Sequence, residues 1–119
     1  MKRLLLVALS TTICLAQPPR QAEPAPTYSD VSYGSHERNV LDFWKVESEK
    51  PTPLVIYIHG GGFRGGDKNS LQAGTLKRLL QAGISVAAIQ YRLVPEHPLP
   101  AAHEDAKRAL QFLRSKAGE

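Results

Sequence analysis

A glycine-rich stretch at residues 59–68, with the sequence HGGGFRGGDK, contains the residues best suited to chemistry. Five of the nine glycines fall within residues 60–66. Glycine lets the backbone adopt positive φ angles and lets a ligand approach the N–H groups closely. The stretch directly follows the apolar residues 54–58. It therefore predicts a turn that presents N–H donors to an anion at the end of a strand.

Several anions could be bound by such a turn. Residues 60–65 fit the dinucleotide pattern G-x-G-x-x-G, but that pattern needs an acidic residue about 20 positions later. No Asp or Glu occurs between Asp67 and Glu96. A phosphate-binding P-loop is disfavoured because Asp67 follows Gly66 where a lysine is required. A glycine turn without chemistry and an oxyanion hole for acyl transfer stay open.

The segments around this turn predict an α/β order of strands and helices. Residues 28–33 and 40–46 flank a turn that starts at Gly34, and they favour an antiparallel hairpin. Residues 54–58 and 84–89 are apolar runs typical of strands buried on both faces. A hairpin followed by strand, helix, strand and helix indicates an α/β sheet.

Two helices complete this order. The leucines within residues 71–82 recur at helical spacing. We expect Asn69 and Ser70 to cap the start of this helix, and Gly83 to cap its end. A second helix is expected from about Pro100, because the alanines and leucines that follow it fall on one face.

Two motifs resemble those of a known family, the α/β-hydrolases, and within it the esterase and lipase group with an HGGG loop. The first motif is residues 59–62, directly after a strand. The second is residues 91–105, YRLVPEHPLPAAHED, which is similar to the segment between a strand and its helix in hormone-sensitive-lipase-like esterases. The longer HGGGFRGGDK, with residues 40–42 upstream, looks most like the bacterial feruloyl and acetylxylan esterase-like branch.

The resemblance implies roles for four residues of the glycine-rich stretch. The N–H groups of Gly61 and Gly62 would be the oxyanion donors that stabilise the tetrahedral intermediate of ester hydrolysis. His59 and Gly60 would support the loop, with His59 holding it by a side-chain hydrogen bond. A catalytic base at His59 is the alternative, but the family places its base near the C-terminus.

Arg92 and Asp105 in the second motif are expected to form a structural pair. Asp105 borders an apolar stripe, where an unpaired carboxylate would be costly. Two separately solvated charges are the alternative. His97 and His103 are expected in a loop and on a helix surface rather than as metal ligands, and the sequence predicts no metal site and no cofactor.

The family's nucleophile is a serine on a G-x-S-x-G elbow between a strand and a helix. The nearest candidate is residues 83–87, where Ser85 follows a helix and lies inside a strand. The nucleophile, acid and base are therefore expected to be absent. Residues 28–119 would be the N-terminal part of an α/β-hydrolase sheet that ends before the nucleophile-elbow strand.

The predicted function is the oxyanion-loop part of a secreted serine carboxylic-ester hydrolase, inactive as an isolated chain. A non-catalytic ligand-binding domain or a degenerate α/β-hydrolase domain is the alternative. The family's strand order would place residues 54–58 at a sheet edge. An apolar edge strand is a template for self-association.

The N-terminus predicts export. Residues 1–16 combine a basic start with an apolar run too short to span a bilayer as a helix, so we expect a signal peptide cleaved after Ala16. Residues 17–27 contain four prolines and predict a linker. The expected location is secreted or periplasmic. The only cysteine, Cys14, would leave with the signal, so no disulfide is expected.

The net charge of the chain limits the classes of partner that it is expected to bind. Loss of Lys2 and Arg3 lowers the net charge from +4 to +2, and no basic run remains. This argues against a nucleic-acid surface. The expected partner is a small-molecule or carbohydrate-linked ester, with no membrane contact after signal cleavage.

Overall fold

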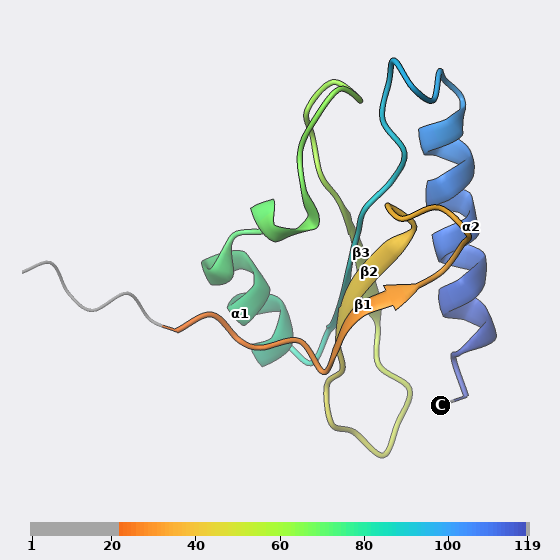
Figure 1. Ribbon diagram of the computed structural model, residues 1–119. Helices are drawn as coiled ribbons and strands as arrows, with labels where there is room; N and C mark the ends of the chain where they lie inside the picture. Colours follow the sequence, from red (N-terminus) through yellow and green to blue (C-terminus); the bar gives the residue numbers. More distant parts are fainter. Residues whose placement is uncertain (1–21, 119) are drawn as a thin grey trace, which may run out of the picture.

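The computed structural model describes residues 22–118, which form a four-stranded mixed sheet with a helix against each face (Figure 1). The signal sequence expected at residues 1–16 and the first part of the expected linker lie outside the described residues. The elements follow in the order β1 (Tyr28–Ser32), β2 (Val40–Trp44), β3 (Leu54–Ile58), the short 3₁₀ helix η1 (Lys68–Ser70), α1 (Ala73–Gln81), β4 (Ser85–Ile89) and α2 (Ala101–Ser115).

The strands lie in the order β1-β2-β4-β3, which confirms the expected hairpin and the expected edge position of residues 54–58. β2 pairs with β1 and with β4 in antiparallel fashion, while β3 pairs with β4 in parallel. Ile58 lies opposite Ile89 at the end of this parallel pair. The segments that leave β3 and β4 therefore start side by side at one edge of the sheet.

Small side chains on β4 let both helices approach the sheet. Ala87 belongs to the core cluster that α2 covers, and Ala88 to the cluster that α1 covers. All five residues of β4 are buried, as its apolar sequence predicts. Trp44 is buried in the α1-side core, and its Nε1 donates a hydrogen bond to the Pro24 carbonyl at 2.8 Å. The end of the proline-rich segment therefore contacts the domain.

The expected cap of α1 is wrong. Asn69 and Ser70 belong to η1, whose cap is Asp67: the Asn69 N–H donates to Asp67 Oδ1 at 2.8 Å. α1 starts three residues beyond Ser70, and Gln72 at its cap position makes no side-chain capping bond. An Asp carboxylate accepts strongly from the N–H two residues on, so Asp67 starts a separate turn of its own.

The expected end of α1 is confirmed. Gly83 has a φ of 76°, and its N–H bonds to the Leu80 carbonyl while the Ile84 N–H bonds to the Leu79 carbonyl. These two bonds form a Schellman motif, which needs a left-handed residue at this position.

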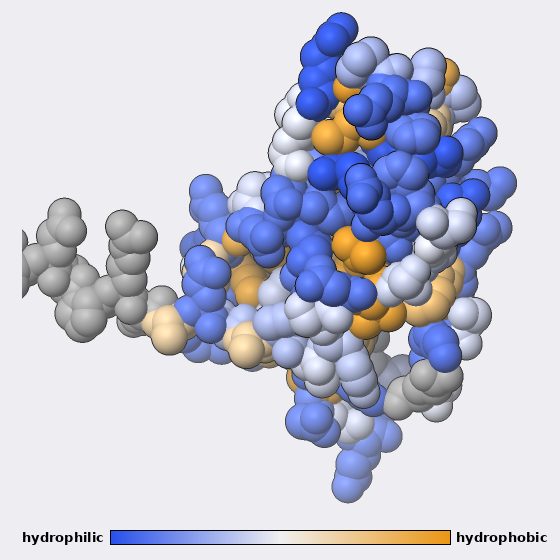
Figure 2. Space-filling view, viewed as in Figure 1, coloured by the Kyte–Doolittle hydropathy of each residue, from blue (hydrophilic) through white to orange (hydrophobic). Residues whose placement is uncertain are grey.

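β3 forms an edge of the sheet, although its composition is typical of a central strand. Leu54, Val55 and Ile58 are 40%, 37% and 51% exposed. The face shown in Figure 2 is largely hydrophilic, with hydrophobic residues reaching it in scattered places. In the described part of the chain neither helix is long and apolar enough to cross a membrane.

Candidate functional site

The glycine-rich stretch forms a loop (residues 59–67) that rises from the end of β3 beside the chain that leaves β4 (Figure 1). A hydrogen bond from the Val94 N–H to the Phe63 carbonyl, at 2.9 Å, joins the two segments. Phe63 itself has a φ of 62°, which is rare for a bulky residue. The loop is therefore a defined structure held against its neighbour.

Glycine is required at the turn of this loop. Gly61 has a φ of 125°, and a Cβ atom there would lie 2.3 Å from the Gly65 carbonyl oxygen. Gly62 has a φ of 60° but open space around it. Gly61 is therefore needed for both space and conformation, and Gly62 for conformation alone.

The N–H groups of Gly61 and Gly62 are open to a ligand. Both residues are exposed, and among residues 22–118 neither N–H has a hydrogen-bond acceptor. The Arg64 N–H closes the turn by donating to the Gly61 carbonyl at 3.0 Å. Successive N–H groups in such a turn can bind an anion.

His59 lies beneath the loop. It is 2% exposed, its Nδ1–H donates to the Gly60 carbonyl at 2.8 Å, and its ring stacks on Tyr91 with centroids 4.2 Å apart. Tyr91 in turn donates its hydroxyl to the His59 carbonyl at 2.6 Å. The other nitrogen, Nε2, is buried without a partner in the described part of the chain. This geometry orients the loop backbone, and among residues 22–118 no serine or threonine hydroxyl is hydrogen-bonded to the ring.

Gly66 is a site residue that sequence reasoning missed. Its φ is 97°, and a Cβ atom there would lie 2.4 Å from His59 Nδ1 and 2.2 Å from the Gly60 carbonyl oxygen. The bare glycine lets the second half of the loop pack onto the first. Its place within HGGGFRGGDK was the only sequence signal for it.

Three buried polar residues near the loop were also missed: Asp42, Lys68 and Gln90, which are 5%, 7% and 8% exposed. Asp42 stands between Leu41 and Phe43 in a strand, and a charge at such a position was a signal that could have drawn attention to it.

Arg92 and Asp105 form an ion pair. Arg92 Nη2 and Nε lie 2.8 and 2.9 Å from the Asp105 carboxylate, and the Arg92 N–H donates to it as well, also at 2.9 Å. Asp105 is fully buried, and Arg108 adds a contact at 3.0 Å. Burial alone would raise the pKa of Asp105, but the hydrogen bonds and charge of Arg92 outweigh it and hold that pKa below its ordinary value. The pair attaches the start of the β4–α2 connection to α2.

Asp105→Asn should lower the stability of the protein at neutral pH and remove part of its acid sensitivity. A carboxyl with a lowered folded pKa stabilises the fold above its unfolded pKa, and this stabilisation is lost as pH falls through the folded value. We expect a loss of about 1.5–3 kcal/mol at pH 7, because hydrogen bonds to a charged group are replaced by weaker ones. Urea unfolding between pH 3 and pH 8 measures both effects.

Glu104→Gln is the matched control for this variant. Glu104 lies 3.6 Å from Arg92 and is 60% exposed, so its loss should cost less than about 1 kcal/mol. Equal effects of the two substitutions at pH 7 would contradict the structural importance of the buried pair.

The other histidines lie around the loop without forming a metal site. His97 is in the β4–α2 connection and contacts His36 edge to face at 4.7 Å. His103 is on the exposed side of α2, and its ring lies 5.3 Å from that of Phe63. Within residues 22–118 no three His, Cys, Asp or Glu side chains are placed to hold a metal ion.

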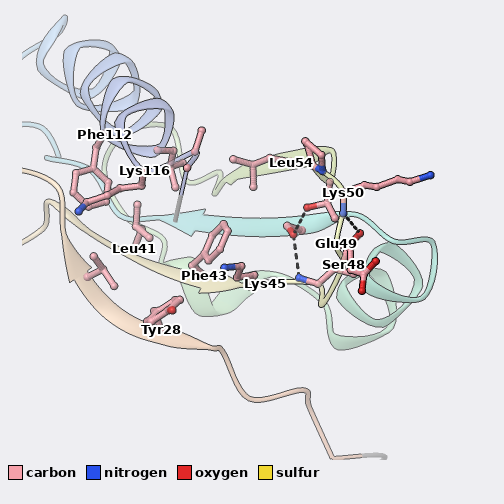
Figure 3. Close-up of a pocket in the computed structure, with 18 residues that line it drawn as sticks. Tyr28, Leu41, Phe43, Lys45, Ser48, Glu49, Lys50, Leu54, Phe112 and Lys116 are labelled. Carbon is pink, nitrogen blue, oxygen red and sulfur yellow. Dashed lines mark hydrogen bonds between the residues drawn. The ribbon is translucent and has the colours of Figure 1, made fainter.

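A cavity of about 690 Å³ opens at the other end of the sheet (Figure 3). Leu41, Phe43, Leu54 and Phe112 give it apolar walls, and Ser85 also lines it. No residue of the glycine loop reaches it. The cavity is therefore separate from the candidate anion site.

Comparisons with known proteins show which family the chain is similar to. The BD-FAE family model matches residues 41–119. The carboxylic ester hydrolase LipN of Mycobacterium tuberculosis is 43% identical over 68 residues, which are 57% of this chain and 18% of LipN. Catharanthine synthase of Catharanthus roseus is 30% identical over 98 residues, which are 81% of this chain and 30% of the synthase.

A solved structure extends the agreement to the fold. The truncated form of a carbohydrate esterase from gut microbiota superposes with a TM-score of 0.66 at 25% identity, covering 85% of this chain and 36% of that structure. The chain thus spans 18% to 36% of the length of these similar proteins. With the family match, the strand order and the esterase relatives in agreement, the chain belongs to the BD-FAE family of esterase-like α/β-hydrolases.

Proposed function

We propose that the chain supplies the oxyanion loop of a secreted serine carboxylic-ester hydrolase. The observation that carries this proposal is the pair of exposed N–H groups of Gly61 and Gly62, which have no acceptor among residues 22–118 and lie in a hydrogen-bonded turn at the end of β3. In ester hydrolysis the carbonyl oxygen becomes negative, and each donor aimed at it lowers the barrier by about 2.7–4 kcal/mol. The substrate would be a small-molecule or carbohydrate-linked ester, in line with the names of LipN and of the carbohydrate esterase.

The deciding experiment places Gly61→Ala in a hydrolase that contains these residues together with a serine elbow. A Cβ at Gly61 would collide with the Gly65 backbone, so the loop could not keep its shape. Loss of kcat in this variant, with activity kept in Gly65→Ala, would support the oxyanion role.

The isolated chain should not be an esterase by this proposal. Ser85, the only serine in a formal G-x-S-x-G-like position, is buried, and its Oγ contacts the Val46 N–H and the Thr52 hydroxyl. In the part of the chain that the structure describes, no serine hydroxyl contacts a histidine nitrogen. The nucleophile, acid and base would come from polypeptide beyond these residues.

A non-catalytic or degenerate domain is the second candidate. It is supported by the name of one relative, which is that of a synthase rather than a hydrolase. This candidate predicts that the loop binds an anion without any covalent step. An extended chain that binds phosphate yet is not labelled by a serine-directed phosphonate would favour it.

Export is part of the proposal. Cleavage after Ala16 would give a mature chain that starts at Gln17. Intact-mass analysis of protein recovered from the periplasm or the medium should show loss of residues 1–16. Recovery of the uncleaved chain from the cytosol alone would contradict export.

A further inference from the structure

A buried ion pair lies under the second half of the glycine loop. Lys68 Nζ is 2.6 Å from Asp42 Oδ2, and both side chains are less than a tenth exposed. A second carboxylate, that of Asp30, lies 3.1 Å from the same ammonium group. A buried charge is costly unless it is paired, so these contacts fix where Lys68 can lie. Burial alone would lower the pKa of Lys68, but the bonds to Asp42 and Asp30 outweigh it and keep the pKa above its ordinary value.

The β1–β2 hairpin is shaped to hold this pair. Asp42 Oδ1 accepts the Asp30 N–H at 2.8 Å and the Ser29 hydroxyl at 3.3 Å. Asp30 has a φ of 51°, and the β1–β2 register is irregular between Tyr28 and Val31. Asp30 thus contacts both members of the pair, and Asp42 is held in place through its second carboxylate oxygen as well.

Gln90, just beyond β4, provides a second attachment for the end of the glycine loop, through Asp67 and Lys68. Its Oε1 accepts the Lys68 N–H at 3.2 Å and its Nε2 donates to Asp67 Oδ2 at 2.6 Å. Arg38 Nη2 donates both to Gln90 Oε1 and to the Gly66 carbonyl, each at 3.1 Å. Residues 66–68 are thus attached to the hairpin and to the sheet by side chains distant in sequence.

Close packing couples residues 66–68 to the turn that contains the open N–H groups. The Cα of Gly66 lies against the His59 ring and the Gly60 carbonyl, and the Gly65 carbonyl lies against the Cα of Gly61. The two halves of the loop have no room to shift separately. A displacement of the segment at Lys68 would therefore move the turn at Gly61.

We infer that Lys68 and Asp42 are positioning residues of the glycine loop, whose ion pair sets the direction of the Gly61 and Gly62 N–H groups. Their catalytic consequence rests on the proposed oxyanion role. The alternative is that the pair contributes only to overall stability. A positioning role predicts that removal of the pair loosens the loop more than the rest of the domain, whereas a purely stabilising role predicts an equal effect on both.

Amide hydrogen exchange of the full chain tests this difference. The Arg64 N–H bonds to the Gly61 carbonyl and reports the closed turn, while the Ala109 N–H in the buried middle of α2 reports global unfolding. Removing one partner of a buried pair leaves an uncompensated charge, so Lys68→Met should speed exchange at Arg64 by roughly tenfold or more relative to Ala109. Lys68→Arg should keep most of the protection. Lys107→Met, on the exposed side of α2, is the matched control and should change neither amide.

Two further variants keep the test decisive if Lys68→Met does not fold. Lys68→Met with Asp42→Leu removes both charges, so it should restore the protection of Ala109 while Arg64 still exchanges fast. Asp30→Asn removes only the exposed carboxylate and retains a residue type that tolerates a left-handed φ. It should speed exchange at Arg64 by a smaller factor.

Equal acceleration at Arg64 and Ala109 in every variant would overturn the inference, as would an unchanged Arg64 in a folded Lys68→Met. These readouts need no catalysis, so they separate the inference from the proposed function. If the loop loosens without Lys68 but Gly61→Ala keeps full kcat in the complete hydrolase, the positioning of the loop stands and the oxyanion proposal fails.

Discussion

Residues 17–119 alone should hydrolyse p-nitrophenyl acetate at no more than a weak background rate. Removal of the nucleophile from a Ser-His-Asp site costs about 10⁶ in kcat, and what survives needs an intact oxyanion hole and binding site. Ser85 is a poor substitute because it pairs with Leu54 at the start of the parallel strands, whereas the loop follows Ile58 at their end. Four residue steps along a strand separate these levels by about 13 Å.

A serine-directed phosphonate provides the measurement. We expect no stoichiometric labelling by intact mass, and any background hydrolysis should be unaffected by the reagent. Labelling at one mole per mole would contradict the prediction, and peptide mapping should then examine Ser85 and Ser70 first. Extension of the chain through a strand, a G-x-S-x-G elbow and the acid and base that follow should give both labelling and turnover.

The same preparation should self-associate, because the outer side of β3 pairs with no strand of residues 22–118 and the strand contains no charge or proline. Sedimentation velocity of the short and the extended chain compares them directly. A short chain that stays monomeric at high concentration would show that the exposed edge is not a sufficient template.

Gly61→Ala should lower kcat by roughly 10²–10³ in the complete hydrolase, with a smaller change in KM. The added Cβ would lie 2.3 Å from the Gly65 oxygen, which is backbone and cannot simply rotate away. The turn must then open and point its N–H groups elsewhere. Gly62→Ala should be milder, because Gly62 has free space and only its φ of 60° disfavours a side chain.

Gly65→Ala is the control for this prediction. Gly65 has no left-handed φ, and a Cβ atom there meets nothing within 4 Å. Its kcat should match that of the parent enzyme. Full kcat in Gly61→Ala would contradict the oxyanion assignment, and an equal loss in both variants would indicate a loop that tolerates no side chain for reasons other than the donors.

Much of the fold could be predicted from the sequence, because local residue patterns determine where strands and helices form. Hydrophobic runs placed the strands, and the resemblance to α/β-hydrolases placed residues 54–58 at the sheet edge, as the structure shows. Gly83 could be predicted as the end of α1, because the residue after a helix often adopts a left-handed conformation that glycine favours. The start of α1 could not be predicted, because Gln72 at its cap position makes no side-chain capping bond, while the good capping residue Asp67 starts the separate turn η1.

The sequence by itself indicated the candidate site's chemistry: a glycine-rich loop directly after an apolar strand, whose N–H groups could be donors to an anion. The tertiary structure alone decided what holds that loop. Lys68 and Asp42 are 26 positions apart, and neither shows in sequence that the other lies 2.6 Å away. Such a pair depends on which strands meet and on how deeply the loop packs. Local periodicity describes one face of one element, whereas a buried ion pair exists only where several elements exclude water together.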